Sequence, residues 1–200
     1  MIHPKRKPIV FLISAPSGAG KTTLSAMLQA EFGASLYTLV TATTRPPRPG
    51  ESDGQSYTFL TPQEFARREA ADEFLEHATV HGCRYGSPRA PVAQALAQGR
   101  DVLLNLDVQG AASVRAALAR WPNPPPLADI FVAPPSLEAL RARLTGRGQD
   151  SADVIAFRLQ QAADEMARWR EFRYLIVNDD LKTAYDQLRA IVLSERARIR

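Results

Sequence analysis

Cysteine and histidine are scarce in this sequence of 200 residues. The one cysteine, Cys83, excludes an internal disulfide and is typical of a protein from a reducing compartment. The three histidines are scattered and lack further ligands nearby, which argues against a metal site built from histidine.

Long apolar runs are also lacking. The basic N-terminal residues are followed by an apolar run of only about five residues, too short for a signal peptide or a membrane-spanning helix. We therefore expect a cytoplasmic protein with no membrane partner.

A strong excess of one charge is missing as well. The 25 Lys and Arg residues against 21 Asp and Glu give a net charge of +4 and a pI near 9.5. This balance suits a polyanionic partner, but no nucleic-acid-binding motif accompanies it, so we expect nucleotides and not nucleic acid. The length fits one domain, residues 1–200, with a substantial core.

The chain is organised around residues 9–23, which read IVFLISAPSGAGKTT. The apolar start predicts a buried parallel strand, and a glycine-rich loop and a helix follow it. Such a loop holds phosphate oxygens with its backbone N–H groups and with the helix N-terminus. Lys21 would reach the β- and γ-phosphates of a nucleotide, and the Thr22 hydroxyl would bind Mg²⁺.

One residue departs from the usual GxxxxGK[ST] pattern, because Ala15 stands at the first glycine. Gly18 and Gly20 can still supply the unusual φ angles, so we interpret Ala15 as a tolerated variant. The alternative is a loop that contains glycine and lysine by chance. Lysine usage argues against it, since Lys21 is the only lysine between residues 8 and 181 and stands where a compact ammonium is required.

Strand-like and helix-like segments alternate along the chain, which predicts an α/β fold with a mostly parallel sheet flanked by helices. We expect further strands at residues 36–40, 54–59, 74–78, 102–107, 130–133 and 174–178. We expect helices at residues 21–32, 62–72, about 88–97 and 108–121, and others starting near 136, 151 and 181. Thr61 and Ser151 are candidate N-caps.

Residues 41–51 form a polar loop stiffened by proline, TATTRPPRPGE. Arg45 and Arg48 in this loop suit bidentate binding of a phosphate group. A solvated basic loop is an equally good interpretation of these residues taken alone.

Together these segments resemble the guanylate kinase family over nearly the whole chain. The most specific match is Thr41-x-Thr-Thr-Arg45-x-x-Arg48-x-Gly50-Glu51-x-x-Gly54-x-x-Tyr57-x-Phe59, which is similar to the family's GMP-binding motif. Further matches are Tyr85-Gly86-Ser87, Asp107-x-Gln109-Gly110, Ala133-Pro134-Pro135-Ser136, Arg143-x-x-Gly146-Arg147-Gly148 and the NDDL at residues 178–181.

The resemblance implies a P-loop NTPase-like core at about residues 8–40, 99–135 and 163–200. It implies an inserted GMP-binding subdomain of mixed strands and helices at about 41–98, and a helical lid at about 136–162. The implied reaction is transfer of the γ-phosphate of ATP to GMP, and we expect also to dGMP, giving ADP and GDP for purine nucleotide metabolism and GMP recycling. Mg²⁺ is the implied cofactor.

The resemblance also assigns roles to individual residues. The implied ATP-binding residues are Ala15, Pro16, Ser17, Gly18, Ala19, Gly20, Lys21, Thr22, Thr23 and Asn178, with Thr22 the ligand of Mg²⁺. The implied GMP-binding residues are Thr41, Arg45, Arg48, Tyr57, Glu76, Tyr85, Ser87 and Asp107. The implied catalytic residues are Lys21 and the lid arginines Arg143, Arg147 and Arg158.

Elementary chemistry supports two of these assignments. Guanine presents N1–H and N2–H₂ as adjacent donors, and a carboxylate such as Glu76 can accept from both, whereas adenine offers an acceptor at N1. Mobile lid arginines would stabilise the charge that develops in phosphoryl transfer and would exclude water. Taken singly, Glu76 would be an ordinary solvated strand residue and each arginine an ordinary surface residue.

Two positions depart from the family pattern. Asn105 stands where the family usually has an acidic residue, which puts Mg²⁺ affinity and turnover in doubt but not the type of enzyme. His77 stands where an aromatic residue is common, and we assign it no role.

Other functions remain as alternatives. A related kinase acting on a sugar phosphate such as ribose 1,5-bisphosphate would lack the guanine site. A guanylate-kinase-like scaffold domain that binds phosphorylated peptides would lose phosphate-loop or lid residues. Both sets of residues are present in this sequence. The sequence leaves open whether the protein is a monomer or a homodimer.

Overall fold

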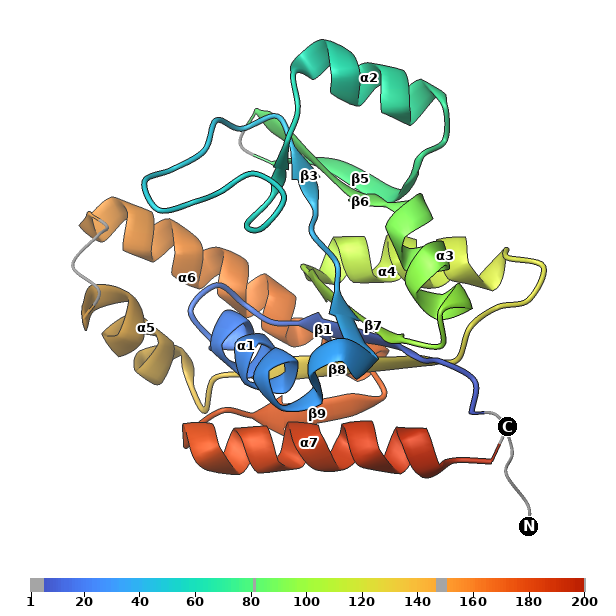
Figure 1. Ribbon diagram of the computed structural model, residues 1–200. Coiled ribbons are helices and arrows are strands. Elements are labelled where there is room, and N and C mark those ends of the chain that lie inside the picture. The colour runs from blue at the N-terminus through green and yellow to red at the C-terminus, as the bar shows by residue number, and fades with distance from the viewer. Residues whose placement is uncertain (1–5, 81, 147–150, 200) are drawn as a thin grey trace.

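The predicted buried strands lie side by side in one parallel sheet. The computed structural model describes residues 6–80, 82–146 and 151–199, and its main sheet has five strands in the order β2-β7-β1-β8-β9. These strands are β1 (Val10–Ser14), β2 (Leu36–Thr38), β7 (Asp101–Leu106), β8 (Leu127–Ala133) and β9 (Tyr174–Val177). All four pairings are parallel, and β1 lies at the centre (Figure 1). The α/β class with a mostly parallel sheet is confirmed.

Side chains of β1 alternate between two apolar cores because successive residues of a strand point to opposite faces. Phe11 and Ile13 pack with α1 (Lys21–Phe32) and α7 (Leu181–Ala197), whereas Val10 and Leu12 pack with α3 (Arg89–Ala97) and α4 (Val108–Ala119). In Figure 1, α7 lies below the main sheet, and α3 and α4 lie above it on the right-hand side. Helices therefore cover both faces of the sheet, and its strands are buried.

A second, smaller sheet lies above the first in Figure 1 and has the order β4-β3-β6-β5. Its strands are β3 (Ala42–Thr43), β4 (Thr58–Phe59), β5 (Phe74–Val80) and β6 (Cys83–Pro88). Helix α2 (Pro62–Ala70) covers it through Phe65, which stacks on Phe74 with ring centroids 4.6 Å apart. The Thr61 side chain accepts a hydrogen bond from the Glu64 backbone N–H and caps α2 as predicted.

The last two helices before β9 form a pair at the left of Figure 1, α5 (Leu137–Gly146) and α6 (Ala152–Ala167). They pack through Leu140, Leu144, Leu159 and Ala162. The Ser151 side chain caps α6, as predicted. Short 3₁₀ turns complete the chain at η1 (Gly33–Ser35) and η2 (Trp169–Glu171).

The structure corrects the sequence prediction mainly in the second sheet. Strands β3 and β6 were not predicted, and of the predicted strand at 54–59 only β4 is a strand. Gly54 has a φ of 73° and lies in a turn, so the backbone before Thr58 cannot continue a strand. Strand β2 is also shorter than predicted, ending at Thr38. In residues 6–80, 82–146 and 151–199, no helix is long and apolar enough to cross a membrane.

Candidate active site

The loop between β1 and α1 has the backbone of a phosphate-binding loop. Gly18 and Gly20 have φ angles of 92° and 99°, in the left-handed region that favours glycine. A Cβ at Gly20 would also lie 2.3 Å from the Nδ2 of Asn178. Both the backbone conformation and this close approach therefore require glycine at position 20. Ala15 is not among the described residues with positive φ, which explains why alanine is tolerated there.

Asn178, the residue directly after β9, holds this loop in place. Its Nδ2 donates a hydrogen bond of 2.7 Å to the Ala19 carbonyl, and the side chain is only 4% exposed. The Asn178 carbonyl in turn accepts a 2.7 Å hydrogen bond from Arg143 on α5. Asn178, predicted on the ATP side, and Arg143, predicted in the lid, therefore lie together beside the phosphate loop.

A cavity of about 510 Å³ opens in front of the loop, at the carboxyl ends of β1 and β7. Ligands of parallel α/β sheets bind at this edge. The predicted site residues that line the cavity are Ala15, Pro16, Ser17, Gly18, Gly20, Lys21, Thr22, Thr23, Thr41, Tyr57, Glu76, Tyr85 and Asp107. The fold thus brings the phosphate loop and the residues of the second sheet to one cavity.

Lys21 is the basic side chain among the described residues that line this cavity. Its Nζ donates a 2.8 Å hydrogen bond to the Leu106 carbonyl at the end of β7. Burial lowers the pKa of Lys21, and the nearby carboxylates of Asp107 and Glu165 oppose this effect. The ammonium is therefore partly desolvated, which strengthens its interaction with a phosphate.

Glu76 is held at the opposite wall of the cavity, in β5. It is 8% exposed, and its Oε1 accepts a 2.6 Å hydrogen bond from the hydroxyl of Ser87 on β6. Burial raises the pKa of Glu76, and this outweighs the opposing hydrogen bond from Ser87. Gly110 lies close to this carboxylate, because a Cβ on it would be in van der Waals contact with Oε2 at 3.5 Å.

Asp107 and Asn105 lie at the end of β7, two residues apart on the same side of the strand. Asp107 caps α4, because its Oδ1 accepts a 2.7 Å hydrogen bond from the Gly110 N–H. The Oδ1 of Asn105 accepts a 2.7 Å hydrogen bond from the Ser25 hydroxyl on α1. Both residues line the cavity, and the Asn105 amide brings no charge to it.

Arg45 and Arg48 lie beside the cavity, not in its lining. Glu51 ties both to their loop: its Oε1 accepts from Arg45 Nη2 at 2.8 Å, and its Oε2 accepts from the Arg48 backbone N–H at 2.8 Å. The Arg45 guanidinium lies 5.4 Å from the ring centroid of Tyr57, and Tyr57 contacts Tyr85 edge-on at 6.1 Å. The hydrogen bond that Arg45 donates to Glu51 is the main reason that the pKa of Arg45 is raised.

Two predicted lid arginines lie away from this cavity. Arg143 lines a second hollow of about 410 Å³ that shares Gly18, Gly20 and Thr23 with the first. Arg158 is half-buried on α6 and is not part of the lining of either hollow. Arg147 lies outside the described residues.

Comparison with known proteins gives the family. The family model for guanylate kinase matches residues 5–195. The chain belongs to the guanylate kinase family. It is 45% identical over 198 residues to guanylate kinase of Hyphomonas neptunium, covering 97% of this chain and 88% of that one. It is 47% identical over 194 residues to guanylate kinase of Cereibacter sphaeroides, covering 96% and 89%.

A solved structure agrees with this assignment. The crystal structure of guanylate kinase from Anaplasma phagocytophilum superimposes with a TM-score of 0.75 at 30% identity, covering 96% of this chain and 88% of that one. Guanylate kinases transfer a phosphate from ATP to GMP, giving ADP and GDP. The P-loop NTPase fold that the resemblance implied is confirmed.

Sequence reasoning missed one charged residue that lines the cavity, Glu165. This carboxylate reaches the lining from α6, beside Lys21 and Asp107. Burial and the charge of Asp107 raise the pKa of Glu165 to about 7, although Lys21 acts in the opposite direction. The only sequence signal is its spacing of seven from Arg158, which places both on one face of a helix, about 10 Å apart.

The donor set of the cavity fits Mg²⁺. No group of three or more His, Cys, Asp or Glu side chains in the described part of the chain could hold a metal ion. Mg²⁺ does not require such a cage, because it keeps several waters and binds through one or two protein oxygens together with substrate phosphates. The Thr22 hydroxyl lines the cavity at the start of α1, where a nucleotide's phosphates would share the ion.

Proposed function

We propose that this chain transfers the γ-phosphate of ATP to GMP, and also to dGMP, in the 510 Å³ cavity between the phosphate loop and the second sheet. One observation carries the proposal. The phosphate loop with Lys21 and the buried, hydrogen-bonded Glu76 line the same space. A phosphate donor and a guanine base would therefore meet within one cavity.

Recognition of guanine is assigned to the far wall. Glu76 would accept from N1–H and N2–H₂ of the base, with Thr41, Ser87 and Asp107 around it. The Ser87 hydroxyl supports this role, because it orients the carboxylate and leaves Oε2 and one lone pair of Oε1 for the two guanine donors. A site built in this way rejects adenine, whose N1 would face the carboxylate with a lone pair.

The GMP phosphate is assigned to Arg45, Arg48, Tyr57 and Tyr85. The Glu51 carboxylate supports this role by fixing the Arg45 guanidinium beside the Tyr57 ring, which limits the rotamer freedom lost on binding. In the same way, the loop backbone and Lys21 would hold the β- and γ-phosphates of ATP, and Asn178 would keep the loop in shape.

The reaction follows from positioning and charge. A GMP phosphate oxygen attacks the γ-phosphorus in line, and it is already an anion, so no strong general base is needed. Lys21 and the lid arginines Arg143, Arg147 and Arg158 would stabilise the charge on the transferring group. The Thr22 hydroxyl would hold Mg²⁺ together with the nucleotide's phosphates, and the ion would supply positive charge that neutralises phosphate charge.

The wider assignments rest on the same chemistry. We propose that the GMP-binding insert (41–98), which contains the second sheet, and the lid (136–162), which contains α5 and the first part of α6, move against the main sheet on binding as parts of one folding unit. We propose a cytoplasmic enzyme, since ATP and GMP are its substrates and one cysteine suits a reducing compartment. Nucleic acid and membrane are not proposed as partners.

The test is ADP release from ATP and Mg²⁺ with GMP, dGMP, AMP, UMP, CMP or ribose 1,5-bisphosphate as the acceptor. Turnover confined to GMP and dGMP is the expected result. Binding of GMP without turnover would indicate a scaffold domain or a disabling effect of Asn105. Turnover with the sugar phosphate would overturn the guanine assignment.

A further inference from the structure

The cavity that receives the phosphates is lined by more acidic than basic groups. Among the described residues, its charged lining consists of Lys21 against Glu76, Asp107 and Glu165. Two of the three carboxylates accept hydrogen bonds from protein groups: Glu76 accepts from the Ser87 hydroxyl, and Asp107 accepts from the Gly110 N–H. The third is unexplained by either nucleotide, because an anion beside Lys21 opposes phosphate binding.

Glu165 differs from the other two in its bonding. No hydrogen bond joins its carboxylate to a protein group in residues 6–80, 82–146 or 151–199. Lys21 has three donor hydrogens, and within the described structure one protein acceptor, the Leu106 carbonyl, takes one of them. Glu165 and Lys21 interact electrostatically without forming an ion pair within 4.0 Å in the described part of the chain, and Lys21, which Asp107 also influences, is the cation of the described lining that faces Glu165.

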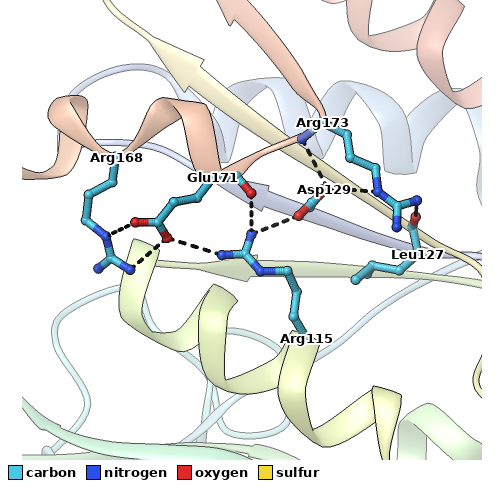
Figure 2. Close-up of polar contacts among 6 residues, drawn as sticks. All are labelled: Arg115, Leu127, Asp129, Arg168, Glu171 and Arg173. Carbon is cyan, nitrogen blue, oxygen red and sulfur yellow. Dashed lines mark hydrogen bonds and ion pairs between the residues drawn. The ribbon is translucent and has the colours of Figure 1, made fainter.

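Helix α6 is fixed close to Glu165 by a network of ion pairs, drawn in Figure 2. Arg168 binds Glu171 at 2.7 Å, and Arg115 of α4 reaches both Glu171 and Asp129 of β8. Asp129 is 3% exposed and also accepts from the Arg173 backbone N–H. Glu165 lies one helical turn before Arg168, at the end of α6 that this network holds against the main sheet.

We propose that Glu165 is a positioning residue, which balances the Lys21 ammonium while the cavity is free of phosphate and takes up one proton from solvent when a nucleotide's phosphates arrive. The proposal rests on the proposed function, because it takes Lys21 to be the phosphate ligand. Its end of α6 is fixed, so the carboxylate would stay at the phosphate site throughout the catalytic cycle.

The charges around Glu165 support proton uptake when a phosphate binds. The groups that face Glu165 are Lys21 from α1, Asp107 from the end of β7 and, across the cavity, Glu76 from β5. Burial, together with Asp107, already raises the pKa of Glu165 to about 7. A phosphate that captures Lys21 removes the compensating cation and adds negative charge, so the protonated carboxyl becomes the favoured form.

The proposal predicts a pH-dependent effect of Glu165→Gln, which resembles the protonated carboxyl. If only the protonated form accepts phosphates, Gln tightens binding by the inverse of the protonated fraction. For a pKa of about 7, this is about twofold at pH 7 and about tenfold at pH 8. The tighter product binding should also lower kcat together with KM, whereas damage to the fold would raise KM.

The experiment is a calorimetric titration in which ADP is added to the protein in the presence of Mg²⁺, at pH 7 and at pH 8. Each titration is done in two buffers of different ionisation enthalpy, so that the number of protons taken up on binding can be calculated. The wild-type protein should take up a fraction of one proton more than Glu165→Gln does, and the ratio of the two dissociation constants should grow with pH. Asp164→Asn is the matched control, since this exposed neighbour on α6 loses the same charge outside the cavity and should change nothing.

The results that would overturn the Glu165 proposal differ from the result that would overturn the proposed function. Equal proton uptake by wild type and Glu165→Gln, or weaker ADP binding by the variant at both pH values, would overturn the proposal. Glu165→Asp, which keeps the carboxylate, should retain the proton uptake and guards against a folding defect in Glu165→Gln. Failure of the wild-type protein to phosphorylate GMP would overturn the proposed function instead, whatever the proton count.

Discussion

Replacement of Gly20 by alanine is expected to destabilise the protein through two separate costs. A φ of 99° places an L-residue in a left-handed conformation, which costs roughly 1–2 kcal/mol. The new Cβ would also lie 2.3 Å from Asn178 Nδ2, so the buried amide must move and give up its hydrogen bond to Ala19. That loss costs about 1 kcal/mol or more, since the Ala19 carbonyl is left without its partner.

The sum for Gly20→Ala is a loss of about 2–4 kcal/mol in the free energy of unfolding. Gly99→Ala is the matched control, because Gly99 has a φ of 76° and nothing within 4 Å of its added Cβ. It should bear only the backbone cost. Urea unfolding curves with unchanged slope would give both values.

A second background separates the clash from the backbone strain. In Asn178→Ala the obstructing amide is absent, so Gly20→Ala should cost no more there than Gly99→Ala costs in the wild type. If Gly20→Ala were no worse than Gly99→Ala in the wild type, or equally costly without Asn178, the argument from close approach would be wrong.

Two further substitutions test the walls of the cavity. Glu76→Gln should lower kcat/KM for GMP by about 100-fold or more, because the amide cannot accept from both guanine donors. Ser87→Ala removes only the hydrogen bond to Glu76 and should have a smaller effect in the same assay. Asn105→Asp should lower the Mg²⁺ concentration needed for half-maximal rate by several-fold, since it adds a carboxylate to the cavity while Ser25 can still donate to it; an unchanged Mg²⁺ dependence would contradict this.

The parts of the fold that depend on local chemistry could be predicted from the sequence. The run from Ile9 to Thr23 determines its own strand, loop and helix, because apolar residues, glycines and the helix start follow directly one after another. The caps at Thr61 and Ser151 are equally local. Each of these features needs no information from distant residues.

The second sheet could not be predicted in the same way. Residues Tyr85 and Gly86 show no apolar alternation, and they form a strand only because β3 and β5 pair with them on either side. The same limit applies to the cavity. Glu165 follows Lys21 and Asp107 at long intervals in the sequence, and only the packing of α6 brings it beside them.

The supporting roles of Glu51 and Asn178 could not be predicted from the sequence either, because they follow from contacts in the folded chain. The sequence motif contains Glu51, but nothing in it indicates that this one carboxylate holds both Arg45 and the Arg48 backbone. The resemblance predicts Asn178 as an ATP-side residue, but it does not indicate that the Asn178 amide lies where a side chain at Gly20 would be. Tertiary hydrogen bonds carry this information.

The most direct test of the account is Lys21→Met, assayed for both turnover and GMP binding. Methionine keeps the length of the side chain without the charge, so the Leu106 contact and the phosphate ligand are lost together. The account predicts that kcat falls by about 1,000-fold or more, because transition-state charge is left unbalanced, while the dissociation constant for GMP changes little. A kcat within tenfold of the wild type would contradict the assignment of this cavity as the site of phosphoryl transfer.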